Sequence, residues 1–172
     1  FQGASHDAVL LSRKQLGVEN DELLLGCFGF IGPTKRMPSV LKALGLLKQQ
    51  VRFKLLVVGE GDDLSACVYD NGLEKHIIQK GFVTDEEFNQ YLQSIDILLN
   101  LRFPSMGESS ATLIQAMAFA RPCIVTDDAS FSELPDRSVY KITSGSQEVE
   151  QLTNAILQLS QPQTRNAIAK AG

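Results

Sequence analysis

The sequence predicts an α/β domain, a Rossmann-like three-layer arrangement with a mainly parallel sheet of about six strands between two layers of helices. Short apolar runs alternate with segments of helical periodicity along all 172 residues. Several of these runs are apolar at consecutive positions, which is typical of strands that are covered on both faces. Strands that alternate with helices form parallel sheets through right-handed crossovers. No internal repeat or low-complexity linker is visible, so residues 1–172 are expected to form a single domain.

Six runs are expected to be strands, at residues 23–31, 53–60, 77–83, 96–101, 122–127 and 139–143. Four segments are expected to be helices, at residues 37–50, 84–95, 110–120 and 146–159. The second of these helices begins at Thr84, a good capping residue, and carries three acidic residues in its first turn, where they complement the helix dipole. Ligands of such sheets bind beyond the carboxyl ends of the strands. The loops that follow the strands are therefore expected to carry the functional residues.

Composition and charge restrict the partners. The formal net charge is −4 and the pI is near 5.2, which argues against nucleic acid as a partner. The apolar runs are too short to span a bilayer, and no signal-peptide pattern is present. The three cysteines are odd in number and widely spaced, which indicates free thiols in a reducing, cytoplasmic compartment. Cys27 and Cys123 lie in apolar runs and are expected to be core residues.

The two ends of the sequence suggest a fragment. The chain opens on Phe1 without a methionine and closes in a helical pattern. We therefore expect a longer protein whose second domain, with its half of the active site, lies outside residues 1–172.

The first loop after a predicted strand combines a turn with two cations. Gly32 and Pro33 form the turn, and Lys35 and Arg36 stand beside the start of the next helix. Backbone N–H groups, an ammonium and a guanidinium together can hold a phosphate. The alternative is an ordinary solvated turn with surface cations.

The loop after the second predicted strand is glycine-rich. Gly59 and Gly61 match half of a dinucleotide fingerprint, but Leu64 stands where the third glycine would be. Bound NAD is therefore disfavoured. The two glycines either approach a ligand or simply form a tight strand-to-helix turn.

The turn into the third predicted helix places Glu108 before two serines, Ser109 and Ser110. Backbone N–H groups at a helix start and serine hydroxyls suit a diphosphate. Glu108 would accept hydrogen bonds from sugar hydroxyls, or would only stabilise the helix dipole. Gln115, two turns further along, is placed to reach a ribose or is satisfied within the fold, and Thr112 either contacts the ligand or only caps and packs.

Other chemistries find little support in the motifs. The sequence has no D-x-D, H-E-x-x-H or C-x-x-C motif, so no dedicated metal site is expected. His6 and His76 are interpreted as surface or capping residues. The two serines lack a G-x-S-x-G context, which argues against a serine hydrolase. Asp127 and Asp128 could bind a ligand hydroxyl or serve a turn.

Three stretches in this order, "FGFIGPTKR", "LLVVGEG" and "GFVTDEEFNQYLQSIDILLNLRFPSMGESSATLIQAMAFARPCIVTDDASFSELPD", resemble the C-terminal domain of a group 1 (family 4) retaining glycosyltransferase. The resemblance covers about residues 23–160. It implies one half of a GT-B fold, which has two Rossmann-like domains and holds a nucleotide-sugar donor mainly through the C-terminal one.

The resemblance also implies roles for individual residues. Lys35 and Arg36 would neutralise the departing nucleotide diphosphate, and Gly81-Phe82-Val83 would meet the base through its backbone. Glu108 would contact the donor sugar, and Ser109-Ser110 would donate to its phosphates. The implied reaction transfers a sugar with retained anomeric configuration, by positioning and charge stabilisation and without a metal or other cofactor.

The sequence departs from the family pattern at two positions of this site. Phe30 replaces the usual arginine of the first loop, and Gln115 replaces the second glutamate of the family's pair. Two alternatives therefore stay open: a non-catalytic module that binds a nucleotide sugar or acts as a scaffold, and a GT-B nucleotide-sugar epimerase. The expected partners are the nucleotide sugar and the missing N-terminal domain, which leaves a peripheral membrane contact through that domain open. The isolated chain is expected to be inactive.

Overall fold

Six parallel strands form the central sheet of the computed structural model, which describes residues 3–107 and 109–171. Their order across the sheet is β3-β2-β1-β4-β5-β6. Their bounds are β1 (Leu23–Phe28), β2 (Phe53–Val58), β3 (Ile77–Lys80), β4 (Ile97–Asn100), β5 (Cys123–Thr126) and β6 (Tyr140–Ile142). This order is that of a Rossmann-like doubly wound sheet and confirms the predicted fold class.

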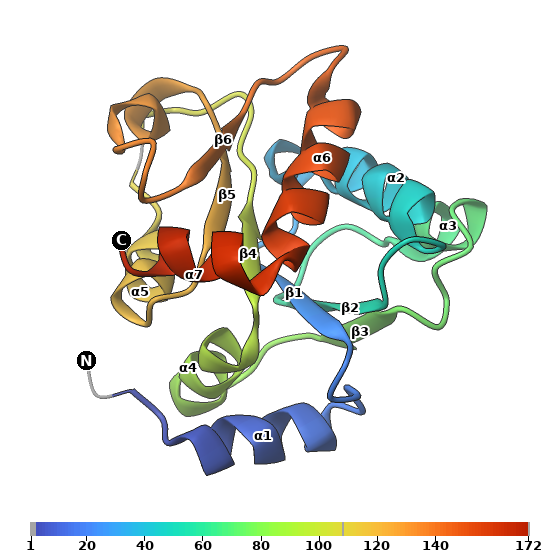
Figure 1. Cartoon of the computed structure of the whole chain (residues 1–172). Coiled ribbons are helices and arrows are strands. Elements are labelled where there is room, and N and C mark those ends of the chain that lie inside the picture. The colour runs from blue at the N-terminus through green and yellow to red at the C-terminus, as the bar shows by residue number, and fades with distance from the viewer. Residues whose placement is uncertain (1–2, 108, 172) are drawn as a thin grey trace.

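Helices cover both faces of the sheet (Figure 1). The α-helices are α1 (His6–Gln15), α2 (Met37–Leu47), α3 (Ser65–Asp70), α4 (Asp85–Ser94), α5 (Ala111–Ala118), α6 (Glu148–Ser160) and α7 (Pro162–Ala169). Two short 3-10 turns are η1 (Pro33–Lys35) and η2 (Ala129–Glu133). Helices α2 and α6 pack against one face, and α4 and α5 against the other. Within the described ranges, no helix is long and apolar enough to cross a lipid bilayer.

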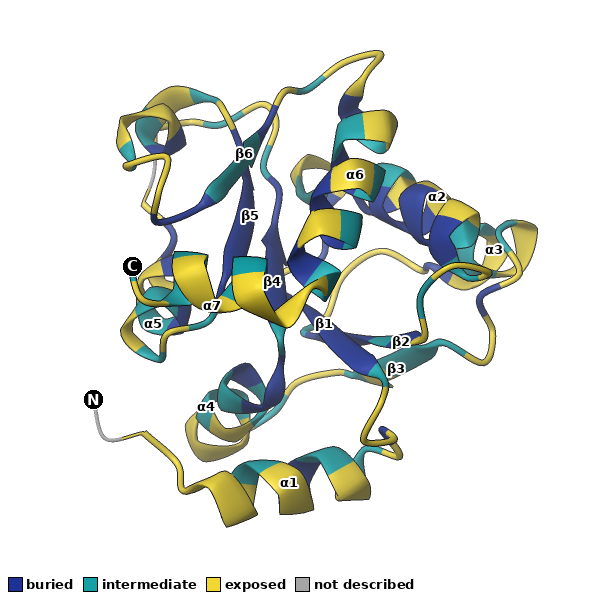
Figure 2. Cartoon of the chain, viewed as in Figure 1, coloured by how far each residue is buried: buried dark blue, intermediate teal, exposed yellow. Residues whose placement is uncertain are grey.

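The four inner strands, β1, β2, β4 and β5, are largely apolar at consecutive positions because both of their faces are buried, whereas the edge strands β3 and β6 are partly exposed (Figure 2). In β1, Leu23, Leu25 and Cys27 pack into the core beneath α2 and α6, whereas Leu24 and Phe28 pack into the core beneath α4 and α5. Alternate side chains of a strand point to opposite faces, so β1 supplies both cores. Burial raises the pKa of the Cys27 thiol to about 12, as expected for a core cysteine. Cys123 is likewise fully buried in the second core.

All six predicted strands are present, but each is shorter than its apolar run. The first ends at Phe28 because Gly29 adopts a positive φ of 94° and turns the chain out of the sheet. The predicted cap of the second helix is confirmed: the Thr84 hydroxyl accepts from the Glu87 N–H, and the Glu87 carboxylate accepts from the Thr84 N–H, which makes a capping box. Helices α1, α3 and α7 were not among the four predicted ones.

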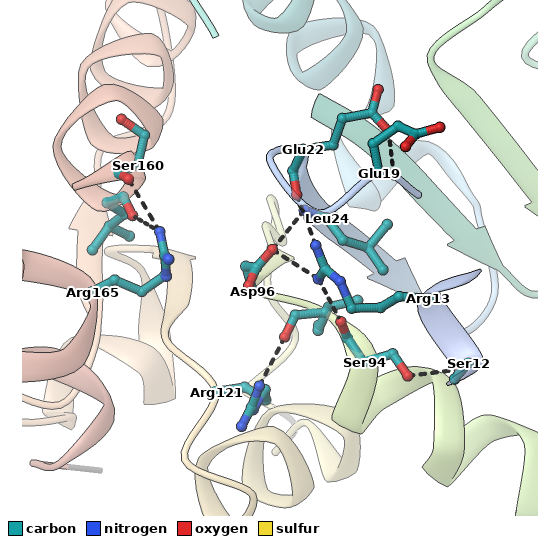
Figure 3. Close-up of polar contacts among 12 residues, drawn as sticks. Ser12, Arg13, Glu19, Glu22, Leu24, Ser94, Asp96, Arg121, Ser160 and Arg165 are labelled. Carbon is teal, nitrogen blue, oxygen red and sulfur yellow. Dashed lines mark hydrogen bonds and ion pairs between the residues drawn. The ribbon is translucent and has the colours of Figure 1, made fainter. Parts of the chain in front are cut away.

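A polar network ties α1 to the amino edge of the sheet (Figure 3). Arg13 Nη1 donates to the Asp96 carboxylate at 3.0 Å and to the Ser94 carbonyl at 3.0 Å, and Arg13 Nη2 donates to the Glu22 carbonyl at 2.7 Å. Asp96 also accepts from the Leu24 N–H at 2.8 Å. One guanidinium therefore joins α1, the start of β1 and the end of α4.

Replacing Arg13 by methionine is expected to lower the free energy of unfolding by about 2–3 kcal/mol, because charged hydrogen bonds to three partly buried acceptors are lost. Urea denaturation measures this change. The matched control is Arg52→Met, which breaks an ion pair with Asp21 in which both side chains are 62% exposed. That change should stay within about 1 kcal/mol. Equal effects of the two substitutions would contradict the structural role given to Arg13.

Candidate functional site

The candidate site lies where the direction of strand order reverses. Strand β1 pairs with β2 on one side and with β4 on the other, so the loops that follow β1 and β4 leave the sheet next to each other. The Phe103 N–H donates to the Thr34 carbonyl at 3.0 Å and joins these two loops directly. Crevices at such switch points are the usual ligand sites of open α/β sheets. The sequence predicted these loops, and the structure brings them together.

The glycine turn after β2 lies against the loop after β1. The Ile31 N–H donates to the Glu60 carbonyl at 2.8 Å, and the Ile31 carbonyl accepts from the Asp62 N–H at 2.7 Å. A Cβ on Gly59 would lie 2.0 Å from the Gly29 carbonyl oxygen, and a Cβ on Gly61 would lie 2.2 Å from the Ile31 carbonyl oxygen. Both glycines are therefore required by the close approach of two backbones.

Lys35 lies at the end of η1 and is half-buried. Its Nζ donates to the Phe28 carbonyl at 2.7 Å, at the carboxyl end of β1. Burial lowers the pKa of this ammonium, and the positive charge of Arg102 lowers its pKa further. The Arg102 guanidinium therefore lies within electrostatic reach of Lys35, and an anion near this cationic pair would be stabilised by both charges.

Arg36 holds a buried carboxylate. Its Nε donates to Glu148 Oε1 at 3.0 Å, and its Nη2 lies 3.0 Å from the same oxygen. Glu148, in the first turn of α6, is 1% exposed. Arg36 itself has a φ of 57°, in the left-handed region, and is the N-cap residue just before α2. Its guanidinium thus forms an ion pair within the domain, and its predicted neutralisation of a diphosphate stays a prediction.

The loop after β4 leads into α5 through Ser110. The buried Ser110 hydroxyl accepts from the Leu113 N–H at 3.2 Å, which makes it the cap of α5, and donates to Asn100 Oδ1 at 3.3 Å. Asn100 ends β4 and is 2% exposed, and its Nδ2 has no hydrogen-bond partner in the described part of the chain. A buried amide donor without a partner is unusual in a folded protein. This donor, beneath the start of α5, is therefore without a partner among the described residues.

The other predicted site residues are spread around this edge. Ser109 is exposed, and Thr112 and Gln115 are half-buried on α5. Phe82 is 87% exposed in the loop after β3, and Val83 beside it packs against the core beneath α4. Glu108 lies outside the described residues. Its predicted contact with a sugar, like the ligand contacts of the other residues, stays a prediction.

Sequence reasoning missed three residues of this edge: Asn100, Arg102 and Glu148. Asn100 is a single polar residue in an apolar strand, and Arg102 follows that strand by two positions. Glu148 lies in phase with the buried face of its helix, four and seven residues before Leu152 and Ala155. The helical periodicity therefore indicates that Glu148 is buried. Its ion-pair partner could not be predicted from the sequence, because Arg36 lies more than a hundred residues away.

The residues described show no grouping of three or more histidine, cysteine, aspartate or glutamate side chains that could hold a metal ion. His76 stacks on Phe53 with ring centroids 4.9 Å apart, and burial lowers its pKa. It lies immediately before β3, away from the carboxyl edge. Asp128 accepts from the Ser105 N–H at 3.3 Å, so it supports the loop after β4.

The comparison with known families agrees with the fold. Residues 22–161 match the model of the group 1 glycosyl transferases, and the chain belongs to this family. The curated relatives include the amylovoran biosynthesis glycosyltransferase AmsK of Erwinia amylovora, 28% identical over 138 residues that cover 74% of this chain and 33% of AmsK. Another is an uncharacterized glycosyltransferase of Methanocaldococcus jannaschii, 24% identical over 134 residues, or 76% of this chain and 34% of the relative. The chain thus spans about a third of the length of these relatives.

Solved structures show the same fold. The Anabaena protein Alr3699/HepE, crystallised with UDP-glucose, superposes with a TM-score of 0.85 at 21% identity, over 97% of this chain and 47% of HepE. The C-terminal domain of the group 1 glycosyl transferase LpcC from Francisella tularensis superposes with a TM-score of 0.81 at 22% identity, over 99% of this chain and 90% of that domain. The predicted assignment to one half of a GT-B fold is confirmed.

Replacing Gly61 by alanine is expected to lower the free energy of unfolding by about 1–3 kcal/mol, because the new Cβ would collide with the Ile31 carbonyl at a φ of 150°. Thermal and urea unfolding measure the loss. Gly81→Ala is the control, since a Cβ on Gly81 would meet nothing within 4 Å. A neutral Gly61→Ala substitution would show that the two loops do not require this close approach.

Proposed function

We propose that this domain binds a nucleotide-diphosphate sugar at the carboxyl edge of the sheet. In the full-length protein, it would take part in transferring the sugar to an acceptor with retention of anomeric configuration. The observation that carries the proposal is Lys35, a half-buried ammonium hydrogen-bonded to the end of β1 at the switch point of the sheet. Membership of the group 1 family supports the transfer reaction, and the UDP-glucose in the HepE crystals supports the class of donor.

The charges and donors at this edge suit a diphosphate. An ammonium has three N–H donors. Lys35 gives one to the Phe28 carbonyl, which leaves two to direct at phosphate oxygens. Arg102 adds a second positive charge, and the Asn100 amide, which has no partner among the described residues, lies beneath the start of α5. An anion is favoured where cations and helix N–H groups converge in a partly buried site.

The same groups would act in the proposed transfer. When the bond from the sugar to the diphosphate breaks, negative charge grows on the leaving phosphate oxygen. Lys35, already fixed by its hydrogen bond to Phe28, would stabilise this charge without reorganising. Glu108 would hold the sugar hydroxyls, as the family motif implies. The acceptor would bind from the part of the full-length protein outside residues 1–172, and sugar transfer is therefore proposed for the full-length protein only.

Lys35→Met tests the donor site in the chain of 172 residues. Isothermal titration with UDP-glucose, GDP-mannose and ADP-glucose would first identify a nucleotide sugar that binds. Lys35→Met should then weaken that nucleotide sugar at least about tenfold, since charged hydrogen bonds contribute about 1.5–3 kcal/mol each.

The control is Lys42→Met, which removes a cation from the exposed face of α2 and should leave the affinity unchanged. Equal affinities of wild type and Lys35→Met would contradict the proposed role of Lys35. Wild-type protein that binds none of the three nucleotide sugars would contradict the donor site itself.

A further inference from the structure

Two strongly exposed phenylalanines line one hollow at the carboxyl edge. Phe30 is 72% exposed and Phe82 is 87% exposed, although aromatic side chains are usually largely buried. They contribute, with glycines and with Val58 and Phe88, to the lining of a hollow of about 330 Å³. The two rings come from different loops, so their presence at one hollow follows from the topology of the sheet.

The strand order explains this placement. Strand β2 lies between β1 and β3, so the loops that carry Phe30 and Phe82 flank the glycine turn that follows β2. The Gly59 N–H donates to the Lys80 carbonyl at 2.9 Å, and the Gly29 N–H donates to the Val58 carbonyl at 2.9 Å, which fixes both loops to β2. The two phenylalanines thus lie on loops at opposite sides of the glycine turn, in which Gly59 has no side chain.

The Phe30 ring is positioned by its own loop. A Cβ on Gly32 would lie 2.9 Å from Phe30 Cε1, so the ring lies directly against the backbone of Gly32. On the other flank, Val83 anchors the loop of Phe82 in the core beneath α4. Both loops are therefore fixed close to the rings that they present.

The hollow adjoins the cation of the candidate donor site. Gly29 lines the hollow, and a Cβ on Gly29 would lie 3.5 Å from Lys35 Nζ. A ligand whose flat end enters the hollow can therefore direct an attached anionic group toward Lys35. A nucleotide diphosphate has this shape: a planar base at one end and phosphates a ribose away.

We propose that Phe30 and Phe82 form an aromatic clamp that holds the nucleotide base of the donor by stacking. This inference rests on the proposed function and assigns a binding role to two side chains, in addition to the backbone contacts expected in the loop of Phe82. Every base has a π-face, so stacking strengthens nucleotide binding whichever base is present. The clamp would cover apolar ring surface that is otherwise in water.

The test compares nucleotides with a ligand that has no base. UDP, GDP, ADP and inorganic pyrophosphate are titrated calorimetrically into the 172-residue chain and into Phe30→Ala, Phe82→Ala and the double variant. Each single substitution should weaken the tightest-binding nucleotide about five- to a hundredfold. This corresponds to about 1–3 kcal/mol for one stacked base. The affinity for pyrophosphate should not change.

Tyr69→Ala is the matched control, because Tyr69 on α3 is also 72% exposed but does not line the hollow. Circular dichroism and thermal unfolding verify that all variants fold. Nucleotide affinities that stay at the wild-type value in both phenylalanine variants would overturn the clamp while leaving the proposed function standing. Equal losses for nucleotides and pyrophosphate would also overturn it. Wild-type protein that binds none of the nucleotides would overturn the clamp and the proposed donor site together.

Discussion

The candidate site depends on how the loop after β1 is fixed. Three contacts from three other segments hold this loop: Ile31 pairs with the glycine turn after β2, Thr34 accepts from Phe103, and Arg36 binds Glu148 of α6. Each contact joins the loop to a part of the chain that is distant in sequence. Lys35 lies among these three anchors, so its ammonium is placed before any ligand arrives. Such preorganisation is what electrostatic stabilisation of a leaving group requires.

The Arg36–Glu148 ion pair fixes the geometry of the loop after β1. A buried ion pair contributes little net stability, because the desolvation of both charges opposes their attraction. Breaking it leaves one charge uncompensated in the interior, so the pair fixes the geometry of the loop strongly. The sequence predicts Arg36, next to Lys35, as a second phosphate ligand. In the structure it connects the loop to α6, and Arg102 is the cation that lies near Lys35.

The fold was predictable because its signals are local. The six apolar runs, the two-sided burial of the inner strands and the Thr84 cap can all be read without knowing any partner strand. Helix α1 was not predicted because its buried residue is a serine, Ser12, and not an apolar residue at helical spacing. The helix is attached by polar contacts to Ser94 and Asp96, which lie more than eighty residues away in the sequence.

The candidate site was predictable at the level of loops but not of single side chains. Gly59 and Gly61 were recognised as a turn, but the backbone that they approach belongs to another loop. The ion pair of Arg36 likewise arises from a contact between distant segments. The grouping of Phe30 and Phe82 around one hollow needed the strand order, which periodicity does not give.

The loops after β1, β2, β3 and β4 are proposed to form a single donor site. Amide chemical-shift mapping of the isotopically labelled chain during titration with a nucleotide sugar that binds tests it directly. Shift changes should concentrate in residues 29–36, 59–62, 81–85 and 100–107, while the amides of Leu24 and Asp96 at the amino edge keep their positions. Changes that concentrate at the amino edge, or that leave residues 29–36 unaffected, would contradict the claim.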